Sequence, residues 1–150
     1  MTQDHFLTRC PSCGAANKIP VARVGQQARC GRCKTALPKE DLGASAPIAV
    51  TDGQFDAVTR HSSLPVLVDF WAAWCSPCRS LAPELERLAA DLAGRLIILK
   101  MDTEAEPFTP SRFGVQAIPT MVLLRRGIEV ERLTGAMPAE AIRSRVERFL

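Results

Sequence analysis

The stretch PVLVDFWAAWCSPC, residues 65–78, decides the fold of the larger part of this 150-residue chain. Residues 65–71 are apolar on both alternating faces except for Asp69, which is the pattern of a strand covered on two sides. Cys75 and Cys78 follow at the carboxyl end of that strand, where open α/β sheets place their functional sites. The stretch therefore predicts an α/β domain with a chemically active turn after its central strand.

Strand and helix patterns alternate around this stretch. We expect further strands at residues 48–50, 95–101, 120–124 and 128–133, and helices at 52–60, 77–93, 107–113 and from 138 onward. Thr51 and Gln54 have the spacing of a capping box for the first helix, and Pro83 should kink the second. The order βαβαβαββα predicts a mixed, mainly parallel sheet with helices on both faces.

The composition indicates a globular protein. A hydrophobic content of 47% is sufficient for at least one packed core. No apolar stretch approaches the length that spans a membrane, and the N-terminus lacks the basic-then-apolar layout of a secretory signal. We therefore expect a cytoplasmic protein that has no membrane partner.

The formal net charge of +3 comes from the N-terminal part of the chain. Residues 1–43 carry seven Lys or Arg against three Asp or Glu, and four thiolates around one divalent ion would remove two of the four excess charges. Phe6 is the one aromatic residue of this segment that could stack on a base. Nucleic acid is therefore not an expected partner.

Four cysteines in the N-terminal segment have the spacing of a tetrahedral zinc site. They are Cys10, Cys13, Cys30 and Cys33, in the pattern C-x2-C-x16-C-x2-C. Two disulfides or four unrelated thiols are the alternatives, and the spacing and a reducing compartment favour zinc over both. Because residues 1–40 hold few large apolar side chains, one Zn²⁺ should supply the folding free energy, with Gly14 and Gly31 relieving the tight turns.

A small, polar stretch interrupted by Gly and Pro separates this segment from the rest of the chain. We expect a zinc ribbon over residues 1–42, a linker over 43–47 and a second domain over 48–150. The role of the ribbon stays open between a structural appendage, a protein-docking surface and a redox sensor that releases zinc when its thiols oxidise.

The Cys75 and Cys78 pair is better explained as a dithiol/disulfide couple than as a metal site, since the other four cysteines already complete one tetrahedron. Cys75 precedes Pro77 at the start of a helix, where N–H groups and the helix dipole favour the attacking thiolate. We expect Cys75 to be the nucleophile. Cys78, one turn inside the helix and less exposed, should then attack the mixed disulfide.

Three further residues are candidates for supporting roles. Asp69 is surrounded by apolar residues, so burial should raise its pKa and let it exchange a proton with Cys78; a structural salt bridge is the alternative. Lys100, near the end of a neighbouring strand, is the expected counter-charge unless it is simply exposed. Trp74 should lie at the rim of the site, because Trp71 already fills the core position.

These residues carry a resemblance to a known family. VDFWAAWCSPC (68–78) resembles the active-site strand and turn of thioredoxins, and IPT (118–120) resembles their cis-proline segment. The match covers residues 48–150 and extends through Pro83, Lys100, Gly114, Gly127 and Gly135. With its ribbon, the whole chain is similar to two-domain bacterial thioredoxins that carry an N-terminal zinc ribbon, the thioredoxin 2 type.

The resemblance implies a thioredoxin-like fold and a reductase that acts on protein disulfides through a redox-active disulfide and is recharged by an NADPH-dependent thioredoxin reductase. Pro119 would follow a cis peptide bond facing Cys75, which excludes metal from the dithiol. Trp74, Ile118 and Gly135 would line the groove that binds an extended substrate segment. Ser76 departs from the family, which usually has Gly at this position. Its hydroxyl is expected to stabilise the Cys75 thiolate and therefore the reduced form, which would make this protein a weaker reductant than its relatives.

Two other functions stay open beside the reductase. An oxidant or isomerase would run the same chemistry in the opposite direction, and the absence of an export signal disfavours it. A zinc-ribbon binding module or redox sensor would use the thioredoxin-like domain only as a scaffold.

Overall fold

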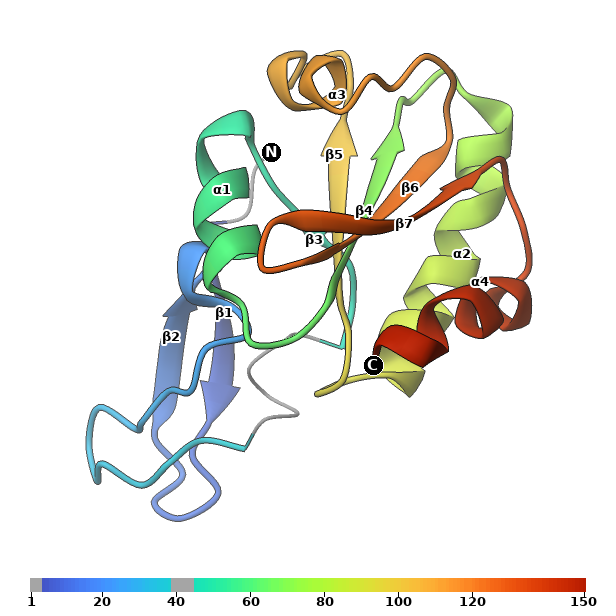
Figure 1. The fold of residues 1–150 in the computed structure, drawn as a ribbon. Coiled ribbons are helices and arrows are strands. Elements are labelled where there is room, and N and C mark those ends of the chain that lie inside the picture. The colour runs from blue at the N-terminus through green and yellow to red at the C-terminus, as the bar shows by residue number, and fades with distance from the viewer. Residues whose placement is uncertain (1–3, 39–44) are drawn as a thin grey trace.

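The computed structural model describes residues 4–38 and 45–150 (Figure 1). The N-terminal segment contains strands β1 (His5–Arg9) and β2 (Ala16–Pro20) and the short 3-10 helix η1 (Val21–Arg23). The second part holds strands β3 (Ile48–Ala49), β4 (Val66–Trp71), β5 (Ile97–Asp102), β6 (Thr120–Arg125) and β7 (Ile128–Thr134). Its helices are α1 (Asp52–His61), α2 (Ser76–Asp91), α3 (Phe108–Arg112), α4 (Ala139–Val146) and the terminal 3-10 helix η3 (Glu147–Phe149). These elements follow the predicted order βαβαβαββα.

Local sequence signals explain where the first helix begins. The Thr51 hydroxyl accepts the Gln54 N–H at 3.1 Å, and the Gln54 side chain accepts the Thr51 N–H at 3.0 Å. This is the reciprocal capping box that the spacing predicts. Pro83 lies inside α2, as expected.

The large sheet has the strand order β3-β5-β4-β6-β7. β3, β5 and β4 run parallel, whereas β6 is antiparallel to β4 and β7 is antiparallel to β6. The sheet is mixed, as predicted, but the expectation of a mainly parallel sheet is wrong, because half of its strand pairs are antiparallel. After β5 the chain passes through α3, and β6 then pairs with the edge of β4 that faces away from β5 and runs antiparallel to it. No local sequence pattern specifies this direction of β6.

Both faces of the sheet are covered. Alternation along β4 sends Val66, Val68 and Phe70 into a core cluster with α1, and sends Leu67 into a second cluster with α2 and α4. Figure 1 accordingly shows α1 on one face and α2 with α4 on the other. Residues 65–71 are therefore apolar on both alternating faces because helices cover both sides of this strand, as the sequence predicts.

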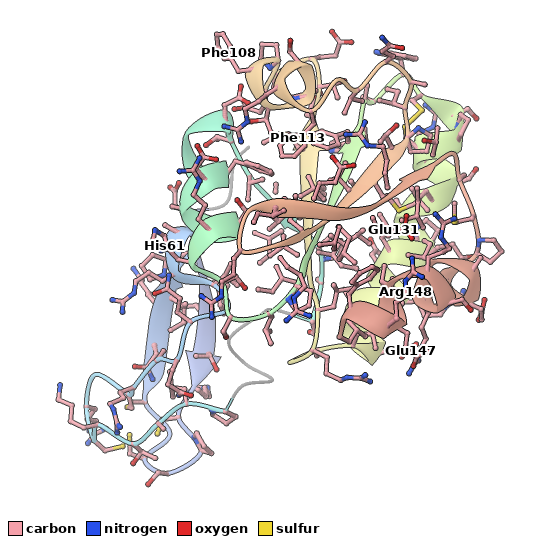
Figure 2. The ribbon with its side chains drawn as sticks, viewed as in Figure 1. His61, Phe108, Phe113, Glu131, Glu147 and Arg148 are labelled. Atoms are coloured by element: carbon pink, nitrogen blue, oxygen red, sulfur yellow. A yellow bond between two sulfur atoms is a disulfide. The ribbon has the colours of Figure 1, made fainter. Side chains whose placement is uncertain are left out.

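α3 is held to the start of α1 by one carboxylate. Asp52 accepts the Thr109 hydroxyl at 2.6 Å, the Thr109 N–H at 2.7 Å and the Phe108 N–H at 3.2 Å. Phe113, just after α3, packs edge-on against Phe55 with ring centroids 5.6 Å apart, whereas Phe108 points outward and is 78% exposed (Figure 2). These contacts fix the segment that leads into β6.

The N-terminal segment packs onto the larger core through η1. Val21 and Val24 are at most 1% exposed and belong to the same cluster as Phe55 and Val58 of α1. Gly25 lies so close to Ser62 and Ile97 that a Cβ atom there would collide with both side chains, and its φ of +79° also favours glycine. Residues 21–25 are therefore part of the packing of the second domain.

The predicted boundaries, 1–42, 43–47 and 48–150, remain predictions. Residues 43 and 44 of the expected linker lie outside the described residues, and residues 45–47 lead directly into β3. The N-terminal segment and the second domain share one apolar cluster, because Val21 and Val24 pack into it.

Candidate functional site

Cys75 and Cys78 form a disulfide at the amino end of α2. Their Cα atoms are 5.2 Å apart, inside the usual range for a disulfide. Cys75 is the N-cap residue of the helix, and its Sγ accepts the Cys78 N–H at 3.2 Å. Because the first N–H groups of a helix and its dipole favour negative charge, this position stabilises a thiolate on Cys75 in the reduced protein.

Both cysteines are covered to the same degree. Each is 3% exposed, and they cluster with Ala72, Trp71 and Ile118. The expectation that Cys78 is less exposed than Cys75 is therefore wrong for the disulfide form. Each sulfur is covered by its bonded partner, and α2 and the Ile118 segment pack on both.

The segment before β6 faces the disulfide. The Ile118–Pro119 peptide bond is cis, and the Ile118 carbonyl oxygen lies 3.8 Å from Cys75 Sγ. Gly135, with φ +91°, donates its N–H to the Pro119 carbonyl at 2.9 Å. Ile118 therefore contacts the disulfide, and Gly135 is joined to the same segment through Pro119.

A groove of about 620 Å³ begins beside the disulfide and is lined by Trp74, Ile118 and residues near α3. Trp74 is 67% exposed, at the rim of the site, and its indole N–H donates to Glu104 at 2.9 Å. Gly135 is outside this lining and adjoins the groove through Pro119. Glu104 is a site residue that the sequence analysis missed, because nothing in its polar loop indicates that it reaches Trp74.

Asp69 lies behind the disulfide and is 5% exposed. Burial raises the pKa of its carboxyl group from 3.8 to about 7, and the positive charge of Lys100 opposes part of that rise. Among the described residues its Oδ1 has no hydrogen-bond partner. A buried carboxyl group that titrates near neutral pH can take up and release a proton under ordinary conditions.

A cavity of about 460 Å³ joins this carboxyl group to the second cysteine. Asp69, Cys78 and Lys100 all line it, together with residues 45–47 and one side of α2. Lys100 is exposed and is paired with Asp69 in the β4–β5 register, so it acts as a nearby charge without a direct ion pair in the described structure. The cavity is large enough for the water that a proton transfer requires.

The four N-terminal cysteines form a second site whose geometry fits zinc. All four Sγ atoms lie within 4.8 Å of one another, with Cys10 to Cys33 at 3.5 Å and Cys13 to Cys30 at 3.6 Å. These separations exceed a disulfide bond of about 2.05 Å and approach the edge of about 3.8 Å in a tetrahedron with Zn–S distances of about 2.3 Å. The alternative of two disulfides is therefore excluded in this structure.

Backbone groups prepare this site for thiolates. Gly14 and Lys34, each directly after a C-x-x-C pair, have positive φ and donate to the carbonyls of Cys10 and Cys30. The expectation for Gly31 is wrong, because the left-handed residue of the second turn is Lys34. The backbone N–H groups of Cys33 and Arg32 lower the pKa of the Cys30 thiol from 9.0 to about 6, which favours the form that binds metal at that residue. At Cys13 a backbone hydrogen bond with Ala15 lowers the pKa, but burial and the three neighbouring cysteines outweigh it and raise the pKa to about 11.

Two family models match separate parts of the chain. Residues 46–148 match the family model described as Thioredoxin, and residues 9–35 match the zinc-ribbon model described as Thioredoxin 2, N-terminal. Thioredoxin C-3 of Corynebacterium nephridii is 39% identical over 129 residues, covering 85% of this chain and 84% of that protein. Thioredoxin of Haemophilus influenzae is 42% identical over 94 residues, covering 63% and 88%.

A solved structure supports the fold. A thioredoxin mutant from Halobacterium salinarum superposes with a TM-score of 0.66 at 31% sequence identity, over 71% of this chain and 93% of that one. Within residues 4–38 and 45–150, no helix combines the length and the apolarity needed to cross a bilayer.

Proposed function

Since the chain belongs to the thioredoxin family and is therefore a protein-disulfide reductase with an N-terminal zinc ribbon, we propose that Cys75 attacks the substrate disulfide and that Cys78 resolves the intermediate. The position of Cys75 at the N-cap of α2, with the Cys78 N–H directed at its sulfur, carries this assignment. The equal burial of the two sulfurs means that exposure does not assign the roles, so helix position does.

The reaction is two exchanges of sulfur bonds. The Cys75 thiolate bonds to one substrate sulfur, and the other substrate sulfur leaves as a thiolate and takes up a proton. Cys78 then gives its proton to the Asp69 carboxylate through the cavity between them and attacks Cys75 Sγ. The second substrate thiolate leaves, so the enzyme is oxidised to the disulfide and the substrate gains two electrons.

Substrate binding is proposed for the groove beside the disulfide. An extended segment of the substrate would pair with the backbone of Ile118, pack on Trp74 and pass close to Gly135. Pro119 would position Ile118 and keep a metal ion away from the sulfurs, while Lys100 would limit the rise in the pKa of Asp69.

Members of the family act on protein disulfides and are reduced by thioredoxin reductase. For this chain we propose an NADPH-dependent reductase as the electron donor and the cytoplasm as its location. The spacing of the four ribbon cysteines, which is typical of a zinc site and not of a secreted disulfide framework, supports a reducing compartment. Zinc bound by Cys10, Cys13, Cys30 and Cys33 would cross-link the ribbon and take no part in electron transfer.

Insulin reduction with single-cysteine variants tests the assignment. Cys75→Ser should abolish turnover, whereas Cys78→Ser should accumulate a mixed disulfide with the substrate, visible by non-reducing electrophoresis and mass spectrometry. Ser80→Ala, on an exposed position of α2, serves as the control and should keep full activity. Turnover by Cys75→Ser, or a mixed disulfide trapped at Cys78 in that variant, would show that the roles are reversed.

A further inference from the structure

A groove in the zinc ribbon has no part in the chemistry described above. It has a volume of about 400 Å³ and is lined by residues 18–20 of β2, by Arg23 and by residues 26–29, which run beside that strand. Figure 1 shows the β1–β2 hairpin at the opposite end of the molecule from α3 and from the carboxyl ends of β4 and β5. A ligand in this ribbon groove would therefore leave the disulfide accessible.

The ribbon groove is strongly positive. Lys18, Arg23 and Arg29 line it and are exposed, and none of them belongs to an ion pair among the described residues. Arg29 donates one N–H to the Lys34 carbonyl, which leaves its charge uncompensated. Asp4 is the one acidic residue in the sequence from 4 to 38. The groove therefore suits a ligand with several negative charges.

The strand along the groove has an open edge. Hydrogen bonds from Cys10 N–H to the Ala15 carbonyl and from Val21 N–H to the Asp4 carbonyl mark two hydrogen-bonded pairs of the antiparallel register. Such pairs alternate along the ladder, so Lys18, which lies opposite Leu7, belongs to a pair that is not hydrogen-bonded. Its N–H and C=O are directed away from β1, toward the free edge of β2.

Apolar side chains complete the lining. Ile19 is 6% exposed and forms the floor, with Pro20 and Ala28 beside it. No aromatic side chain is among the lining residues, so a nucleic acid would find phosphate partners there but no surface on which its bases could stack. An open strand edge, apolar contacts and unpaired cations together are the features that bind an extended peptide.

We propose that the ribbon groove binds an extended acidic segment of a partner polypeptide, which adds to β2 as a third strand. The backbone of the segment pairs with the N–H and C=O of Lys18, and its carboxylates lie against Lys18, Arg23 and Arg29. Smaller apolar side chains, which alternate with the acidic ones along a strand, contact Ile19 and Ala28. The ribbon is then a docking module that holds a partner protein while a disulfide of that partner reacts at the far end of the molecule.

The probe is a synthetic peptide of about seven residues in which Glu and Val alternate, with blocked ends. It is titrated into the full, zinc-loaded chain labelled with ¹⁵N. We expect shifts of the amide resonances of Lys18, Ile19 and residues 26–29, and exchange of the Lys18 amide slowed by about tenfold at saturation. A peptide methylated on every backbone nitrogen, which has no N–H to donate from either edge, should bind much more weakly.

Charge-reversed variants test the electrostatic half of the proposal. Arg23→Glu and Arg29→Glu should each weaken binding by about tenfold, because attraction is replaced by repulsion. Arg95→Glu changes the net charge equally at an exposed position outside the groove and outside the zinc site, and it should bind the peptide as the natural chain does. Measured zinc content identifies a variant that has lost its fold, and Arg23→Gln then provides a milder change at the same position.

Three results would each overturn the proposal. The first is the absence of shifts at the groove residues when the peptide is added. The second is binding without protection of the Lys18 amide, or equal binding of the methylated peptide, which would indicate attraction between charges without strand addition. The third is a thymidine oligonucleotide that gives the same shifts at lower concentration than the peptide, which would assign the groove to nucleic acid.

Discussion

Replacing Asp69 with asparagine should stabilise the oxidised protein, and by an amount that depends on pH. The folded chain keeps the proton of Asp69 up to a pKa of about 7, whereas the unfolded chain releases it near 3.8. Between these values the folded state binds more protons, so the free energy of unfolding of the natural chain falls as the pH rises and levels off above the folded pKa. Asparagine carries no such charge, and its variant lacks this decline.

The size of the effect follows from the two pKa values. The difference between about 7 and 3.8 corresponds to a penalty of about 4 kcal/mol for the buried carboxylate, because each pKa unit is worth about 1.4 kcal/mol. Asp69→Asn should therefore be more stable than the natural chain by up to about 4 kcal/mol at pH 8, and by only about half as much at pH 5.5. The absence of a hydrogen-bond partner for Oδ1 means that the substitution breaks few contacts.

Urea unfolding of both proteins at the two pH values measures the difference. Asp52→Asn is a control of opposite sign: burial raises the pKa of Asp52, but hydrogen bonds from Thr109 and Phe108 outweigh it and the net pKa is lowered. Asp52→Asn should be less stable than the natural chain at both pH values. The ionised Asp52 carboxylate stabilises the folded state, and this stabilisation is lost only when the pH falls through the lowered pKa. An advantage of Asp69→Asn that is equal at pH 5.5 and 8 would refute the reasoning, because a pH-independent gain cannot come from a buried charge.

Three other changes have measurable outcomes. Val24→Ala should lower the free energy of unfolding of the whole chain by about 2 kcal/mol, because the side chain is fully buried beside α1; an unchanged urea midpoint would show that the ribbon contact adds nothing. Glu104→Gln weakens the partner of the Trp74 indole and should raise KM for insulin several-fold with little change in kcat; an equal fall of both kcat and kcat/KM would contradict a role in substrate positioning. Ser76→Gly should make the reduction potential against glutathione more negative, and a change smaller than about 10 mV would discard the expected contact with the thiolate.

The sequence predicted the elements of the second domain because their signals are local. Two apolar faces at residues 65–71 and the capping box of Thr51 and Gln54 each specify one element, and the structure contains both. In α2 the signal is the helical spacing of Leu81, Leu85 and Leu88, which are all buried. The ribbon was predictable for a similar reason, since two C-x-x-C pairs at this spacing have few uses other than zinc binding.

The features that the sequence did not predict depend on long-range contacts. Val21 and Val24 lie in a single short turn with no periodicity, so nothing marks them as part of the core of the second domain. Glu104 is thirty residues from Trp74, in a polar loop that resembles any solvated one. The direction of β6 depends on which edge of β4 remains open, a property of the whole sheet. The cis bond before Pro119 was expected only through the family resemblance.

The fit of Gly25 between Ser62 and Ile97 limits how this protein can be recombined. The Gly25 carbonyl also accepts the Ser63 hydroxyl at 2.7 Å, so the junction is specific to both partners. A chimera that transplants this ribbon onto the catalytic half of a single-domain relative would lose the matching surface unless the end of α1 and the loop after it were exchanged together with it. The unit for exchange therefore extends into the catalytic half through Ser63, and position 97 must also keep a side chain that fits against Gly25. A fusion designed at the linker alone would join two parts that do not fit.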